Sequence, residues 1–84
     1  MAEVVHECEY RIAQPGKGSY RVTAMAEPRG NVWIGWIEFT SEIDGSILRT
    51  DEETSQPTRE HVAYWASGLE PVYLDGALSR AKRG

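Results

Sequence analysis

The sequence contains a single cysteine, Cys8, and this scarcity limits what can hold the fold together. One cysteine cannot form a disulfide within the chain, so the core must stabilise the fold, and a reducing compartment is the simpler expectation. The chain also lacks any apolar run near the roughly 18 residues that a membrane-spanning helix requires. Its opening stretch, MAEVVHECEY, lacks the basic and apolar regions of a signal peptide. We therefore predict a cytoplasmic protein that does not associate with membranes.

Basic residues are scarce relative to acidic ones. Nine Lys and Arg residues stand against 13 Asp and Glu residues, and the formal net charge is -4. Because non-specific binding to nucleic acid depends on Lys and Arg that displace counterions from phosphates, this balance disfavours a nucleic-acid partner. It does not exclude a local basic patch.

The motifs of established catalytic sites are absent from the sequence. There is no Gly-rich phosphate loop, no GxSxG, no HExxH and no CxxC. His6 and Cys8 would lie on one strand face, as a metal pair or a Cys-His nucleophile would, and His61 is the only other histidine. Two ligands do not form a metal site. We therefore predict no catalytic residue, no metal and no cofactor.

Apolar and polar residues alternate with a period of two over the first half of the chain, which predicts strands. In the first strand, His6, Cys8, Tyr10 and Ile12 should share the buried face. Turn signals, among them the Asp44-Gly45 step, separate the strands. Because consecutive strands with short connections usually pair, we expect an antiparallel meander in the order 1-2-3-4. The predicted strands are residues 3–13, 19–27, 32–40 and 46–50.

Beyond the segment SQPT the apolar period changes to about 3.6, which predicts two helices. They should cover residues 58–67 and 71–82, with Gly68 ending the first in the left-handed conformation and Pro71 opening the second. A chain of 84 residues is too short to divide into two stable units. The sequence thus predicts one α+β domain, residues 1–84, in which both helices pack on one face of a four-stranded sheet.

The third predicted strand, VWIGWIEF, is apolar on both of its faces. If Trp33, Ile37 and Phe39 face the helices, an apolar stripe that includes Trp36 faces away from them. A bulge at Gly35 would exchange the two faces. The outer face is expected to carry the candidate interface residues Val32, Ile34, Trp36, Met25, Arg11 and Arg21.

Three interpretations of this outer face stay open. Arg11, Arg21 and Met25 can lie across Trp36 and cover it without any partner. The stripe can instead be an interface for a second copy of the chain, since exposed apolar patches tend to mark association sites. It can also bind single-stranded nucleic acid or a small ligand, with Arg49 and the other arginines on the phosphates.

The leading functional hypothesis is a non-enzymatic protein-interaction module that forms a homodimer through the outer sheet face or an edge strand. One alternative is a protein that binds single-stranded nucleic acid or a small ligand on the aromatic face. The other is a small oligomeric enzyme built on His6, Cys8 and His61.

The segment TDEETSQPTRE, residues 50–60, gathers four acids before the first helix. It lacks the ligand offsets and the glycine of an EF-hand loop, so we interpret these acids as solvated loop charges. Further along, Tyr64 and Tyr73 lie off the main apolar stripes of the helices. They are candidates for hydroxyl contacts at the rim between helix and sheet.

The stretch from residue 50 to residue 78, together with the preceding WIEF, resembles the C-terminal part of small bacterial proteins of unknown function. The resemblance implies a bacterial origin. It implies no activity, no cofactor and no functional residue.

Overall fold

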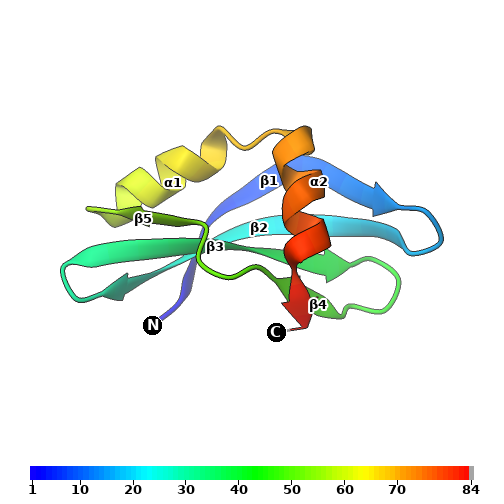
Figure 1. Cartoon of the computed structure of the whole chain (residues 1–84), viewed down its shortest axis with the longest axis horizontal. Helices are drawn as coiled ribbons and strands as arrows, with labels where there is room; N and C mark the ends of the chain where they lie inside the picture. The colour runs from blue at the N-terminus through cyan, green and yellow to red at the C-terminus, as the bar shows by residue number, and fades with distance from the viewer. Residues whose placement is uncertain (84) are drawn as a thin grey trace.

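The computed structural model describes residues 1–83 and contains one antiparallel sheet and two helices (Figure 1). The predicted α+β class with an antiparallel sheet is therefore confirmed. Along the chain the elements are β1 (Glu3–Gln14), β2 (Gly18–Arg29), β3 (Val32–Ser41), β4 (Ile47–Arg49), β5 (Thr54–Gln56), α1 (Arg59–Ser67), α2 (Pro71–Arg80) and β6 (Lys82–Arg83).

Within residues 1–83 the sheet has six strands, and the prediction of four was wrong. The strand order is β1-β2-β3-β4-β6, so the first four strands do form a meander. Strand β3 shares its second edge between two partners, because β4 pairs with residues 38–40 and β5 pairs with residues 33–35. The two missed strands, β5 and β6, span three and two residues, which is too short for an alternating pattern to reveal them.

The main apolar core joins side chains of the sheet to side chains of both helices. The register of β2 and β3 sets Val22 opposite Phe39 and Ala24 opposite Ile37, and all four residues are at most 2% exposed. Trp33 was expected in this core, but it is half-buried and lies outside the cluster. The cluster comprises Cys8, Ile12, Tyr20, Val22, Ala24, Ile37, Phe39, Ala66, Leu69, Leu74, Ala77 and Leu78.

Strand β1 departs from the simple alternation that its sequence suggests. Its pairing with β2 shifts register twice, between residues 4 and 6 and between residues 7 and 11. Each irregularity changes which side chains reach a given face. Tyr10, expected on the buried face with Cys8, is therefore 44% exposed, while Val5 packs against the core.

Helix α1 begins with a side-chain cap and ends without the left-handed glycine that was expected. Thr58 Oγ1 accepts a hydrogen bond of 3.1 Å from the backbone N–H of His61, which satisfies one of the free donors at the helix start. Gly68 has φ -96°, so the prediction of a left-handed C-cap was wrong. Its backbone N–H still closes the helix by donating to the carbonyl oxygen of Trp65 at 3.2 Å.

Helix α2 opens at Pro71 and ends at Arg80, short of the predicted residue 82. Ala81 is extended, with φ -71° and ψ 148°, and the two basic residues that follow it enter the sheet as β6. Neither helix among residues 1–83 is long and apolar enough to cross a membrane.

Candidate functional site

The outer face of β3, which points away from Ile37 and Phe39, is covered by the chain itself. Ile34 and Trp36 are each 3% exposed, and Val32 is half-buried. Ile34 and Trp36 therefore do not form an exposed apolar stripe, which agrees with the interpretation that side chains of the same chain cover this face. Both residues are buried yet lie outside the main core cluster, which means that other side chains cover them.

The cover of Trp36 comes from β4. The Cζ atom of Arg49 lies 4.6 Å from the centroid of the Trp36 ring, a cation-π arrangement. The indole N–H of Trp36 donates to Glu38 Oε2 at 3.1 Å, so its polar atom is also satisfied. Arg49 pairs with Glu38 across the β3-β4 ladder, which places its side chain on the same face as Trp36.

The other predicted interface residues lie in two separate places. Met25 pairs with Trp36 across the β2-β3 ladder and is half-buried beside it. Arg11 and Arg21 face each other across the β1-β2 ladder, and both are exposed. Arg11 forms an ion pair of 3.2 Å with Glu42. Arg11 and Arg21 were expected to cover Trp36, but the arginine that lies over its ring is Arg49.

A hollow of about 580 Å³ opens over this outer face, and we call it the basic hollow. Strand β3 forms its floor, and β4, β6 and the segment that follows β4 surround it. Four of its nine lining residues are Lys or Arg, in a chain that has only nine basic residues in all. The lining comprises Arg29, Ile34, Trp36, Arg49, Thr50, Asp51, Glu52, Lys82 and Arg83.

Charge pairing within the basic hollow is incomplete. Arg29 forms an ion pair with Glu52 and a second, longer one of 3.4 Å with Glu27. Among residues 1–83, none of the ion pairs involves the other three cations of the lining, Arg49, Lys82 and Arg83. The hollow therefore gathers positive charge within a chain whose net charge is negative.

Strand β6 is what brings two of these cations to the hollow. Its residues pair with β4, Lys82 with Arg49 and Arg83 with Leu48. Sequence reasoning missed both residues because it assigned Lys82 to a continuing helix and left Arg83 outside every element. The run of basic residues near Ala81 was the only available signal.

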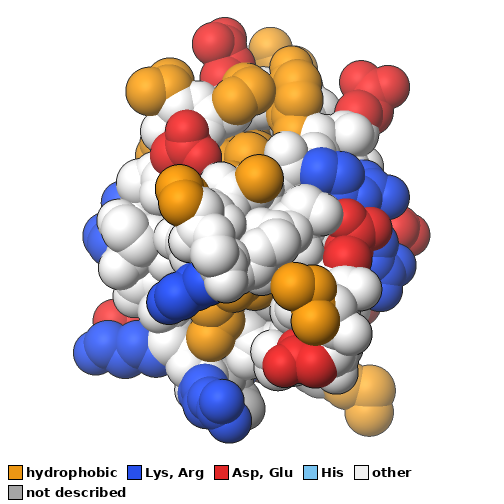
Figure 2. All heavy atoms as spheres, turned by 90° about the vertical axis from the view of Figure 1, so that its right-hand side faces the viewer, with side chains coloured by type: hydrophobic (Ala, Val, Ile, Leu, Met, Phe, Trp, Pro, Cys, Tyr) orange, Lys and Arg blue, Asp and Glu red, His pale blue; other side chains and the backbone are white. Residues whose placement is uncertain are grey.

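A second candidate surface lies where α1 connects to α2, and we call it the junction surface. Tyr64 and Val72 are 81% and 78% exposed there, and together they place two large side chains at the surface beside one hollow. They border a hollow of about 520 Å³, whose lining comprises Tyr64, Trp65, Ser67, Gly68, Leu69, Glu70, Val72 and Tyr73. Hydrophobic side chains gather in the upper part of Figure 2, the level at which the α1-α2 connection lies in Figure 1.

The charged side chains that line the junction surface and the hollow beside it are acidic, while Arg80, paired with Glu53, lies over the ring of Tyr73 at 5.8 Å from its centroid. A smaller hollow of about 290 Å³ adjoins it and shares residues 67–70 of its lining. The smaller hollow also includes Glu9 and Tyr10 from β1. Glu9 and Glu70 are the charged residues of the two linings, and neither lining contains a Lys or Arg.

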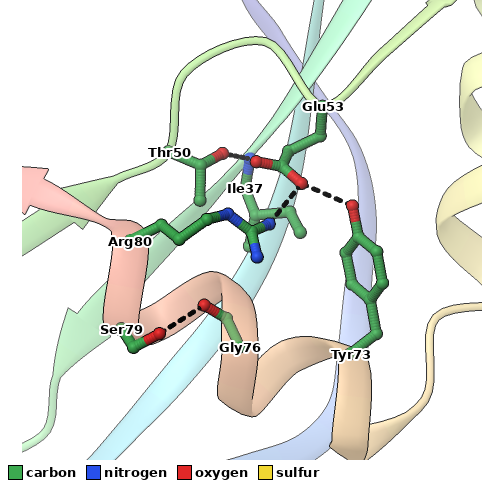
Figure 3. A network of polar contacts seen from close by, with 7 residues as sticks. All are labelled: Ile37, Thr50, Glu53, Tyr73, Gly76, Ser79 and Arg80. Atoms are coloured by element: carbon green, nitrogen blue, oxygen red, sulfur yellow. Dashed lines mark hydrogen bonds and ion pairs between the residues drawn. The ribbon is translucent and has the colours of Figure 1, made fainter.

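Glu53 connects the segment after β4 to helix α2 (Figure 3). Its carboxylate accepts hydrogen bonds from the Tyr73 hydroxyl and from Arg80 Nη2, the latter at 2.7 Å. The Glu53 side chain is only 10% exposed, so its interpretation as a solvated loop charge was wrong. Partial burial, followed by the hydrogen bond to Glu53, raises the pKa of Tyr73. This cluster attaches α2 to the segment after β4, with the Glu53 carboxylate engaged by both donors.

His6 and Cys8, which the sequence places on one strand face, both line the smaller hollow beside the junction surface, and His61 is not part of that lining. Burial raises the pKa of the Cys8 thiol, which keeps it protonated and a poor nucleophile. His61 sits at the start of α1, with its Nδ1 atom 2.6 Å from Thr58 Oγ1. No cluster of three or more potential metal ligands occurs within the part of the chain that the structure describes.

Comparison of the chain with protein-family models, with curated proteins and with solved structures found no match. The two surfaces defined above must therefore be interpreted from their own chemistry.

Proposed function

We propose that the chain is a non-enzymatic protein-interaction module whose contact region is the junction surface. The observation that carries the proposal is the exposure of Tyr64 and Val72 beside an apolar hollow. Exposed apolar patches with aromatic residues and a hollow to receive a side chain are typical of protein interfaces. Trp65 and Leu69 line the hollow and would contact the inserted side chain.

The proposal takes both helices to lie on the inner face of the sheet. It is supported by the core cluster, in which Ala66 of α1 and Leu74 of α2 join Phe39. The junction surface is then the outward side of this helical layer. It would be free to receive a partner without disturbing the core.

The surfaces favoured by the sequence are less suitable for association. The outer sheet face offers less apolar surface than an exposed stripe would, because Ile34 and Trp36 are buried within the chain. The edge of β1 is irregular at two places, and bulges hinder pairing with another strand. Arg59 also reaches this strand, pairing with Glu3 at 2.5 Å and approaching the Val4 carbonyl oxygen at 3.5 Å.

The charge around the junction surface indicates the partner's chemistry. Glu9 and Glu70 would attract a segment that presents an apolar side chain flanked by Lys or Arg. A second copy of the chain fits less well, since a two-fold contact through this surface would set two linings that hold acids and no Lys or Arg against each other. We therefore propose a partner protein with a basic and apolar segment.

Peptide titration tests this function directly. The probes are a Lys/Leu amphipathic peptide and a Glu/Leu peptide of the same apolar pattern, with binding followed by intrinsic tryptophan fluorescence. We expect the Lys/Leu peptide to bind more tightly, and Val72→Ser to weaken its binding about tenfold through the loss of buried apolar surface. Ile43→Ser is the matched control, because Ile43 is 73% exposed and lies outside both hollows of the junction.

Two results would contradict the proposal. One is equal binding of both peptides, which would show that Glu9 and Glu70 do not favour a basic partner over an acidic one. The other is an equal loss with Val72→Ser and with Ile43→Ser. Light scattering over a range of concentrations tests self-association. If the wild type is a dimer and the Tyr64→Ser variant is a monomer, the junction surface binds a second copy of the chain and not a different protein.

A further inference from the structure

We infer that the basic hollow on the outer face of β3 binds a small phosphate-bearing ligand with a planar ring, of the mononucleotide type. The inference rests on different residues from the proposed function, since no residue lines both the basic hollow and the junction surface. The volume of the basic hollow, about 580 Å³, lies within the usual range of small-ligand pockets, roughly 300–1,000 Å³.

Three cations of the hollow are available for the anionic group. Arg49, Lys82 and Arg83 are all exposed, and none of them belongs to an ion pair among residues 1–83. They come from two adjacent strands. Pairing sets Lys82 directly opposite Arg49, whereas Arg83 pairs with Leu48 and lines both the basic hollow and a second hollow beside Tyr20 and Ser41. Lys and Arg held side by side on paired strands form charge-assisted hydrogen bonds with phosphate oxygens.

The acids of the hollow do not cancel this charge. Glu52 is occupied by its ion pair with Arg29. Asp51 is the remaining acid of the lining, against the three unpaired cations. The hollow therefore retains a positive balance that a dianionic phosphate would neutralise.

The floor of the hollow supplies a place for a planar ring. Arg49 lies over the Trp36 ring, and yet it is an exposed residue, so one side of its guanidinium is available to a ligand. Guanidinium planes are common stacking partners of nucleobases. A base stacked on Arg49 would continue the Trp36-Arg49 stack outward, with its phosphate near Lys82 and Arg83.

A nucleic-acid strand fits this face less well than a mononucleotide. Strand-binding surfaces present several exposed aromatic rings along a positively charged groove. Here Trp36 is 3% exposed and is already covered, and the chain has a net charge of -4. The positive charge is confined to one hollow, which suits a single phosphate-bearing group.

Calorimetric titration at low ionic strength tests the inference. The probes are AMP, ribose 5-phosphate, adenosine and a short oligothymidylate. We expect AMP to bind more tightly than ribose 5-phosphate, and adenosine to bind least. The double variant Lys82→Gln/Arg83→Gln should weaken AMP binding by about tenfold or more, because two charge-assisted contacts are lost.

Two further variants make the test specific. Arg21→Gln removes one exposed positive charge from β2, outside the hollow, and should leave AMP affinity within about twofold of wild type. Arg49→Ala should remove the preference for AMP over ribose 5-phosphate while ribose 5-phosphate still binds. Circular dichroism of each variant verifies that it is folded.

Three outcomes would overturn the inference. The first is the absence of AMP binding at millimolar concentration to folded wild-type protein. The second is a loss of binding free energy with Arg21→Gln that is half or more of the loss with Lys82→Gln/Arg83→Gln, which would show that only net charge matters, since the double variant removes two charges and Arg21→Gln removes one. The third is binding of the oligothymidylate without binding of AMP, which would assign the face to a nucleic-acid strand.

Discussion

Strand β3 is buried on both of its faces, but the two faces are covered by different chemistry. On the inner face, Ile37 and Phe39 are fully buried among apolar side chains of the core cluster. On the outer face, Ile34 and Trp36 are almost as buried, but an arginine lies over the tryptophan. Apolar cover is lost only by opening the core, whereas a charged side chain regains its hydration when it moves aside. The outer cover can therefore move without opening the core, and the inner cover cannot.

The largest loss of stability is expected from a substitution on the inner face of β3. Phe39→Ala should lower the free energy of unfolding by about 3–5 kcal/mol, because it removes a fully buried ring and leaves a cavity. Urea denaturation followed by circular dichroism measures this loss. A cost below about 1.5 kcal/mol, the range of conservative core substitutions, would show that the inner face is not the rigid one.

Gly35 tests how closely the inner face meets α1. A Cβ atom at this position would lie 2.7 Å from Val62 Cγ1 and 3.0 Å from Thr54 Cγ2, closer than van der Waals contact allows. Gly35→Ala should therefore cost about 1–3 kcal/mol of stability, the usual penalty for overpacking. Denaturation of Gly35→Ala, Val62→Ala and the double variant measures the coupling. A double variant that loses the full sum of the single losses would show that the two side chains do not meet.

The fold was predictable where the sequence repeats a pattern long enough to recognise. Residues 19–27 alternate over nine positions, and the helices show their apolar period over two or more turns. Strand β5 has three residues, and its place beside β3 depends on the path of the chain after β4. Tyr10 was misplaced because a register shift in β1 depends on backbone geometry that alternation does not report.

The candidate site was predictable only in part. The pattern of VWIGWIEF identified Trp36 as a residue that needs cover, and cover by an arginine was one of the interpretations. Which arginine supplies it depends on strand pairing, and Arg49 rather than Arg11 proves to be the neighbour. Lys82 reaches the hollow only because α2 ends at Arg80, a boundary that the helical pattern does not fix.

Removing the hydroxyl of Tyr73, on α2, should lower the free energy of unfolding by a smaller amount, and this amount should depend on pH. Tyr73→Phe should cost about 1 kcal/mol at neutral pH, because the hydroxyl no longer donates to Glu53. The pKa of Tyr73 is raised above its ordinary value of 10.0, so the unfolded chain ionises first. This contribution is therefore complete below pH 10.0 and is lost as pH rises through the folded-state pKa.

Thermal denaturation of wild type and Tyr73→Phe at neutral pH and at about pH 11 measures the difference. The stability gap between the two proteins should narrow at the higher pH. A constant gap would show that the hydroxyl proton has no role in fastening α2. The comparison with Phe39→Ala then separates the polar attachment of this helix from its apolar attachment.

The smallest loss of stability is expected from a substitution on the outer face. That substitution should instead make Trp36 clearly more accessible to solvent. Arg49→Ala should cost only about 0.5–1 kcal/mol, the usual range for a cation-π contact near the surface. It should nevertheless expose Trp36, because the atoms that cover the ring are removed. Acrylamide quenching of tryptophan fluorescence measures this exposure, with Trp36→Phe giving the contribution of the other two tryptophans. Arg21→Ala, an exposed arginine of the neighbouring strand, is the control. Quenching that rises equally in both variants would mean that Arg49 does not cover Trp36, and the distinction between a rigid inner face and a movable outer face would fail.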